Sequence, residues 1–153
     1  MLASLLTLVS CFGNKDESIV ILYENDVHCE LDGYSKLAAM KAELKSSYDH
    51  VGVVSSGDFV QGGTLGAVSK GEYVVNLMNK VGYDAIALGN HEFDYQLERL
   101  EELNNLSSTK FISCNFAEVG EEESYFDPYT IVSYGKVKIA YIGIITPDTI
   151  SSA

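Results

Sequence analysis

Short apolar runs alternate with amphipathic stretches through most of this chain. Four apolar runs rich in β-branched residues each predict a buried strand. They cover residues 18–23, 51–55, 84–88 and 110–114. Three stretches between these runs carry apolar side chains at helical spacing, with polar residues on the opposite face. They cover residues 34–47, 72–81 and 94–106. The order β-α-β-α-β-α-β predicts an α/β fold with a mainly parallel βαβ sheet covered by helices.

The pattern changes in the last part of the chain, where a β-hairpin is expected. Residues 129–134 and 137–145 are strand-like and flank the turn signal Tyr134-Gly135-Lys136. The run 139–145 is almost wholly apolar, so both of its faces are expected to be buried inside a sheet. Residues 19–153 are therefore interpreted as the truncated, N-terminal portion of a longer domain.

The first residues are interpreted as a targeting segment and not as part of the fold. Residues 1–9 are mostly apolar and too short to span a bilayer, which is typical of a signal-peptide core. They lead into Leu8-Val9-Ser10-Cys11, which resembles the bacterial lipobox, where the cysteine carries the lipid. We therefore expect residues 1–18 to be a signal peptide with a lipobox and a polar tether, and an exported protein, periplasmic or at the cell surface, anchored at Cys11. An ordinary cleaved signal or a frayed apolar tail is the alternative.

Composition and charge narrow the range of partners that the protein could bind. The chain has 153 residues, 46% of them apolar, which is enough for one domain with a core. Its formal net charge of −12 gives it no attraction for nucleic acid or for an anionic lipid surface. Contact with a membrane is therefore expected only through the lipid anchor, and the sequence leaves the oligomeric state open.

Two further cysteines, Cys29 and Cys114, could pair in an exported protein, and the sequence does not decide whether they do. Cys114 lies in a strand-like run, which favours a small core residue over a disulfide partner.

Three short polar segments follow the first three predicted strands. They are Asp26-Val27-His28, Gly57-Asp58 and Gly89-Asn90-His91-Glu92, and Asp26, Asp58 and Asn90 follow one another at intervals of 32 residues. The carboxyl ends of parallel strands meet at one edge of a sheet, so the segments are expected to lie together. Alone, each segment fits a turn or a helix cap. Together, their Asp, His and Asn side chains predict a metal site.

These segments resemble the signature of the metallophosphoesterase superfamily, which is DxH, then GD, then GNH followed by Glu or Asp. Within it they are most similar to the 5′-nucleotidase family. The similar stretches are residues 21–28 (ILYENDVH), 55–63 (SSGDFVQGG), 87–95 (ALGNHEFDY) and 142–148 (IGIITPD). The resemblance implies an incomplete portion of the four-layer metallophosphoesterase fold. It also implies a metal-dependent hydrolase of nucleotide phosphate esters.

The resemblance assigns metal ligands residue by residue. Asp26 and His28 would bind the first of two divalent ions of the Mn, Zn, Co or Fe class. Asp58 would bridge both ions, and Asn90 would bind the second through its amide oxygen. The implied reaction is attack of a metal-activated hydroxide on the phosphorus of a nucleotide or related phosphoester substrate.

The resemblance also implies that Asn90 and His91 contact the substrate phosphate. His91 would be the catalytic histidine, held and kept charged by Asp94 three residues later. Asp94 also fits the N-cap of the helix that follows it.

The sequence departs from the family pattern in two places. Cys29 stands where the family has Gly after DxH, and no histidine follows His91, although the family takes further ligands from downstream histidines. The remaining histidine, His50, is expected at the surface, away from the site. The 153-residue chain alone is therefore expected to be inactive.

Two hypotheses follow from this pattern. One is a lipid-anchored phosphoester hydrolase. The other is a catalytically incomplete fragment or degenerate lipoprotein that binds metal weakly or binds a partner. A generic nucleotide-binding domain is disfavoured because no glycine-rich phosphate loop follows the first strand.

Overall fold

The computed structural model describes residues 17–147 and residue 149, and its centre is a parallel sheet. The strand order is β1-β2-β3-β4. The strands are β1 (Ile19–Glu24), β2 (His50–Ser55), β3 (Ala85–Ala87) and β4 (Phe111–Ile112). The register of β1 and β2 runs from Ile19 opposite His50 to Glu24 opposite Ser55, so the loops after both strands leave the sheet side by side. The predicted parallel sheet is confirmed.

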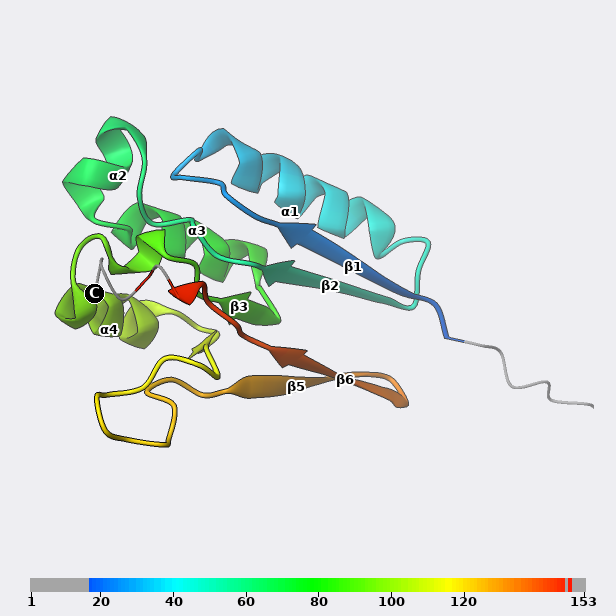
Figure 1. Cartoon of the computed structure of the whole chain (residues 1–153). Coiled ribbons are helices and arrows are strands. Elements are labelled where there is room, and N and C mark those ends of the chain that lie inside the picture. Colours follow the sequence, from blue (N-terminus) through cyan, green and yellow to red (C-terminus); the bar gives the residue numbers. More distant parts are fainter. Residues whose placement is uncertain (1–16, 148, 150–153) are drawn as a thin grey trace, which may run out of the picture.

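Helices connect the strands, as the apolar periodicity predicted. They are α1 (Asp32–Leu44), α2 (Gly63–Ser69), α3 (Glu72–Val81) and α4 (Leu97–Leu106), with a short 3₁₀ turn, η1 (His91–Phe93), after β3. Figure 1 shows α1 running along β1 and β2, with α3 behind the sheet and the hairpin at its lower side. Helix α2 was not predicted from the sequence, because its seven residues are rich in Gly and Ser and carry little helical periodicity.

Helices α1 and α3 are joined by a lysine that reaches across them. The ammonium group of Lys41 donates to the carbonyl oxygens of Val81 at 3.0 Å and Gly82 at 2.5 Å. These carbonyls end α3, where the helix dipole favours a cation. Burial lowers the pKa of Lys41, because the ammonium group leaves water to make this contact. The contact fixes the angle between the two helices that cover one face of the sheet.

The predicted hairpin is present and packs beside the sheet. It consists of β5 (Tyr129–Tyr134) and β6 (Val137–Ile142), paired antiparallel. The hydroxyl of Tyr134 donates to Asp84 Oδ2 at 3.0 Å, and the same carboxylate oxygen accepts the backbone N–H of Val53 at 3.0 Å. One carboxylate therefore ties the hairpin to β2 and to the start of β3.

The expectation that residues 139–145 are buried on both faces is wrong for the described residues. Ile142 and Ile144 are 63% and 70% exposed, whereas Gly143 and Ile145 are buried. Among the described residues, β6 pairs only with β5, in a two-stranded sheet. An apolar run cannot by itself distinguish a strand covered on both faces from one covered on one face.

The placement of Cys114 in the core is also wrong. Strand β4 ends at Ile112, and the chain then turns so that Ser113 is buried and Cys114 is exposed. Cys29 is buried, and neither of these cysteines forms a disulfide. Cys11 lies outside the described residues, as does the whole predicted signal segment up to residue 16.

One hydrophobic core lies between the sheet and the helices. Its fully buried members come from β2, the loop after it, α3, the β3 region and α4. They include Val53, Phe59, Val60, Val74, Val75, Ile86, Phe93, Leu100 and Phe111. Within the part of the chain that the structure describes, no helix is long and apolar enough to cross a bilayer.

Candidate metal centre

The loops after β1 and β2 are hydrogen-bonded to each other residue by residue. The backbone N–H of Asp26 donates to the carbonyl of Gly57 at 3.2 Å, and that of His28 donates to the carbonyl of Asp58 at 2.9 Å. The N–H of Cys29 continues the series to Phe59 at 3.1 Å. The pairing of β1 with β2 therefore extends into the two loops. It holds the DxH and GD segments side by side.

Strained backbone is concentrated in these two loops. Asp26, His28, Cys29 and Asp58 have φ angles of 56°, 46°, 58° and 61°, in the left-handed region that side chains rarely adopt. Each such residue costs about 1–3 kcal/mol and persists only where the surrounding contacts enforce it. Three of the four are residues that the sequence identified as metal ligands.

The contacts of His28 fix the orientation and the tautomer of its ring. Its Nδ1 lies 3.1 Å from the backbone oxygen of Gln61 and 3.1 Å from the side-chain Oε1 of the same residue. Both partners are acceptors, so Nδ1 carries a proton, and in the neutral ring Nε2 would hold the lone pair. Nε2 faces Asp26, whose Oδ1 is 3.6 Å away. A neutral imidazole held in this way, beside a carboxylate, is a suitable metal donor pair.

The third loop docks against the second through Asp58. The backbone N–H of His91 donates to Asp58 Oδ1 at 2.9 Å. A Cβ atom on Gly89 would collide with the same carboxylate oxygen, so only glycine permits this approach. The rings of His28 and His91 stand edge to face with their centroids 5.0 Å apart. All three predicted segments therefore meet at one edge of the sheet, as expected from their positions after parallel strands.

His91 and Asp94 form the pair that the sequence proposed. Asp94 Oδ2 lies 2.9 Å from His91 Nδ1, and both residues belong to the turn that contains η1. The hydrogen bond to Asp94 raises the pKa of His91, and the charges of Asp94, Asp58 and Glu92 act in the same direction. Asp94 does not cap α4, because that helix begins three residues later and Gln96 occupies its N-cap position. The side chain of Asp94 serves His91 alone.

Asn90 is the residue of the third loop that directly precedes His91. Its backbone oxygen accepts the N–H of Phe93 at 3.3 Å, which closes the η1 turn. Within residues 17–147 its side-chain amide makes no hydrogen bond, so the amide oxygen could bind a metal ion or accept a hydrogen bond from a ligand.

Glu92 holds the arrangement together, and sequence reasoning gave it no role. Its carboxylate is 1% exposed and accepts four backbone N–H groups. Oε2 accepts from Asp58 at 2.8 Å and Gly89 at 2.6 Å, and Oε1 accepts from Phe59 at 2.8 Å and Val60 at 3.3 Å. Burial raises the pKa of Glu92, while these backbone donors oppose the rise. The position of Glu after Gly-Asn-His was visible in the sequence, but three of its four backbone partners come from another loop.

Comparison with known proteins agrees with this geometry. The model of the calcineurin-like phosphoesterase family matches residues 19–152. The chain belongs to this family. It is 34% identical to a snake venom 5′-nucleotidase of Gloydius brevicauda over 152 residues, covering 86% of this chain and 26% of that protein. It is 33% identical to the 5′-nucleotidase of Vibrio cholerae, covering 89% of this chain and 27% of that protein.

Solved structures give the same result at the level of the fold. A 5′-nucleotidase precursor from Thermus thermophilus superposes with a TM-score of 0.77 at 26% identity, covering 87% of this chain and 29% of that one. The calcineurin-like phosphoesterase YfkN from Bacillus subtilis superposes with a TM-score of 0.74 at 25% identity, covering 86% of this chain and 49% of that one. The chain thus spans about a quarter to a half of the length of these relatives.

The three loops offer carboxylate, imidazole and amide groups, which are kinds of group that bind divalent ions. Their carboxylates do not converge on a single point. Asp26 and His28 approach each other, and Asp58 offers a second carboxylate beside His91. Nevertheless, no three His, Cys, Asp or Glu side chains among the described residues gather closely enough to hold a metal ion by themselves.

Cys29 does not add a ligand to this set. Its thiol donates to the carbonyl oxygens of Phe59 at 3.3 Å and Val60 at 3.0 Å. Burial raises the pKa of Cys29 to about 11, which disfavours the thiolate. Cys29 thus acts as a further tie between the first two loops.

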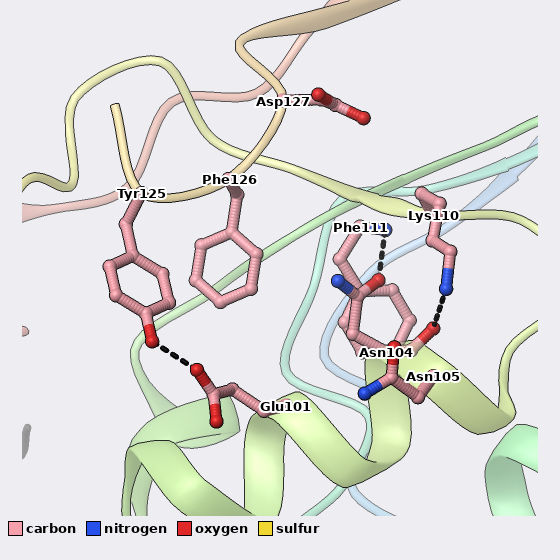
Figure 2. Close-up of a pocket in the computed structure, with 8 residues that line it drawn as sticks. All are labelled: Glu101, Asn104, Asn105, Lys110, Phe111, Tyr125, Phe126 and Asp127. Atoms are coloured by element: carbon pink, nitrogen blue, oxygen red, sulfur yellow. Dashed lines mark hydrogen bonds between the residues drawn. The ribbon is translucent and has the colours of Figure 1, made fainter. Parts of the chain in front are cut away.

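Two other features lie away from the site. His50 begins β2 at the opposite end of the strand, where it faces Glu17 at 3.6 Å, and its expected distance from the site is confirmed. A polar cavity of about 460 Å³ lies between α4, the start of β4 and residues 125–127. Figure 2 shows that Tyr125 bonds to Glu101 there, and that Lys110 and Phe111 bond to Asn104. These contacts fasten α4 to the sheet and leave the cavity without a catalytic group.

Proposed function

We propose that this chain carries the first part of a metal-dependent phosphoesterase centre that hydrolyses nucleotide phosphate esters. The observation that carries the proposal is the meeting of three strand-end loops in one hydrogen-bonded network, with the His91–Asp94 pair directly beside Asp58. Membership of the calcineurin-like phosphoesterase family supports the reaction class.

The proposed ligands are Asp26, His28, Asp58 and Asn90, which would hold two divalent ions of the Mn, Zn, Co or Fe class. Their oxygen and imidazole donors suit these ions better than thiolate-preferring ones. When bound, such ions polarise a phosphoryl oxygen and lower the pKa of a water molecule. Asp58 could serve both ions because a carboxylate offers two oxygens, one of which accepts the backbone N–H of His91.

His91 would act on the phosphoryl group as a proton-bearing residue. Asp94 accepts a hydrogen bond from Nδ1–H, so the second ring nitrogen, Nε2, is left to face the substrate. The raised pKa of His91 favours the doubly protonated ring, which can donate a hydrogen bond to a phosphoryl oxygen or a proton to the leaving oxygen. Asn90, the neighbouring residue, would contact the same phosphate.

The proposed substrates are nucleotides, because the relatives from snake venom and Vibrio cholerae carry the name 5′-nucleotidase. Venom relatives are secreted, which supports export of this protein as well. We propose that residues 1–18 direct this export and that Cys11 carries the lipid anchor. Residues 19–153 would then be the N-terminal portion of the metallophosphoesterase domain.

A metal-binding test separates this proposal from its alternative. The EDTA-treated chain is titrated with Mn²⁺ by calorimetry, and inorganic phosphate binding is followed by Mn²⁺-induced broadening of its ³¹P resonance. Asp58→Asn is expected to weaken Mn²⁺ binding at least tenfold. His91→Ala is expected to weaken phosphate binding and to leave Mn²⁺ binding within about threefold. His50→Ala, at the far end of β2, is the matched control and should change neither.

Each result has a definite consequence. Phosphate binding that does not depend on Mn²⁺ would overturn the proposal. Equal loss of Mn²⁺ and phosphate in His91→Ala would make His91 a ligand instead of a catalytic residue.

A second interpretation, metal binding without turnover, is favoured by the incomplete convergence of acidic and histidine side chains in the described residues. It predicts Mn²⁺ binding without hydrolysis of a nucleoside monophosphate by the 153-residue chain. Robust turnover by this chain would show that the four ligands suffice.

A further inference from the structure

A second polar cluster lies at the end of β1, where Val27 of the first site loop forms part of its wall. A cavity of about 130 Å³ is lined by Glu24, Val27, Gly33, Tyr34, Leu37 and Tyr83. Glu24 is the last residue of β1, Tyr34 comes from the first turn of α1, and Tyr83 precedes β3. Three elements that are far apart in the sequence therefore contribute one oxygen-bearing side chain each.

The oxygen atoms of these three side chains are buried, and none has a well-aligned hydrogen-bond partner among the described residues, although Glu24 lies near enough to Ser55 and Tyr83 to interact with both. These oxygen atoms are both carboxylate oxygens of Glu24 and the hydroxyl oxygens of Tyr34 and Tyr83. Tyr34 and Tyr83 are only 3% and 5% exposed, so bulk water does not reach their rings. Folded proteins pair the great majority of their buried polar groups, and a cluster of unpaired ones indicates a bound ion or ligand. The cavity is therefore built for an occupant.

The charge and shape of the cavity select the occupant. No lysine or arginine is among the described residues that line it, and the nearby Glu92 adds negative potential. The rings of Tyr34 and Tyr83 attract cations through their faces. One carboxylate supplies a single negative charge, whereas divalent-ion sites gather several. The volume holds an ion with a few waters, since one water occupies about 30 Å³.

We propose that this cavity binds one small monovalent cation, of the ammonium or alkali-metal class. The carboxylate of Glu24 neutralises the ion. The phenol oxygens of Tyr34, in α1, and of Tyr83, just before β3, contact it. The ion joins β1 to α1 and α3 just before the chain enters the DxH loop. This site is independent of the divalent ions proposed above.

Thermal unfolding in different salts tests the proposal. The EDTA-treated chain is unfolded in equal concentrations of potassium, sodium, ammonium, methylammonium or choline chloride, with circular dichroism as the readout. A cation that binds, present at about ten times its Kd, should raise Tm by about 3–6 °C relative to choline chloride. Choline is the reference because it is too large for the cavity. Glu24→Gln, which is nearly isosteric and neutral, is expected to abolish the difference between salts. Glu43→Gln, on the exposed face of α1, should retain it.

Direct observation of the ion completes the test. In ¹⁵N-ammonium chloride, the ammonium protons are expected to show Overhauser contacts to the rings of Tyr34 and Tyr83. Tyr34→Phe and Tyr83→Phe keep the rings but remove one oxygen each, and should weaken binding several-fold. A Tm that is equal in all salts, a response that persists in Glu24→Gln, or contacts to water alone would each overturn the proposal. If Tm responds only to ammonium ions or only to alkali-metal ions, the result identifies which class of cation binds in the cavity.

Discussion

The strongest consequence of the structure concerns Glu92, whose carboxylate accepts backbone N–H groups from two of the three site loops. In Glu92→Gln, one oxygen becomes an NH₂ group that faces two N–H donors and cannot accept from them. A hydrogen bond to a charged acceptor contributes about 1.5–3 kcal/mol, so two lost bonds amount to about 3–6 kcal/mol. The substitution also removes a buried charge, which offsets part of this loss. We expect the free energy of unfolding to fall by about 2–4 kcal/mol, a large share of the roughly 5–15 kcal/mol typical of a domain.

Urea unfolding measures this loss. With m of about 1–3 kcal/mol/M, the midpoint should fall by about 1–2 M. Glu98→Gln, the same change on an exposed position of α4, should leave the midpoint unchanged. Hydrogen exchange gives the local test, because protection should fall first at the amides that Glu92 accepts. Those amides belong to Asp58, Phe59, Val60 and Gly89. If the free energy of unfolding of Glu92→Gln lies within about 0.5 kcal/mol of that of the parent, and these amides are still protected, the role assigned to the ionised carboxylate is refuted.

Three further perturbations test other parts of the site. Asp94→Asn replaces the charged acceptor that raises the pKa of His91 with a neutral one, so an NMR titration of the His91 ring should give a lower pKa than in the parent; an unchanged value would contradict the role given to Asp94. Gly57→Ala drives a Cβ atom into the backbone nitrogen of Gly89 at a φ of 101°, and should lower Tm by more than about 5 °C in a differential scan, whereas Gly120→Ala, with open space around it, should cost much less. Burial raises the pKa of Glu24 from 4.5 to about 7, so the native chain binds more protons than the unfolded chain between these values, and the free energy of unfolding should fall as pH rises from about 4.5 to 7 in choline buffer. Glu24→Gln should flatten that part of the pH profile, and a profile equal to that of the parent would contradict the assignment.

The sequence predicted the parts of the fold that local patterns control. Apolar runs located the strands, and helical spacing located α1, α3 and α4. The order of these elements placed Asp26, Asp58 and Asn90 after parallel strands, and hence at one edge of the sheet. Those inferences succeeded because strand direction and the length of a βα unit limit the possible topologies.

The failures share a physical cause, which is dependence on contacts between distant residues. Cys114 was assigned to the core by the apolar character of its neighbours, but the turn at Ser113, bonded to Asp127 and followed by a bond from Cys114 to Gly143, carries the thiol to the surface. Asp94 was a plausible helix cap until the helix was seen to begin at Leu97. Glu92 is polar and lies in a motif, yet its burial follows from backbone donors that lie 32–34 residues earlier.

The strained residues explain why so many hydrogen bonds converge on these loops. Left-handed φ values at Asp26, His28 and Asp58 together oppose folding by about 3–9 kcal/mol. The contacts that resist relaxation are the ladder between the first two loops, the bonds from His28 to Gln61 and the four donors to Glu92. These contacts restrict the backbone that carries the proposed ligands. A substitution among these contacts should therefore weaken metal binding without removing a ligand, as outer contacts do in metal sites, by about 10–100-fold.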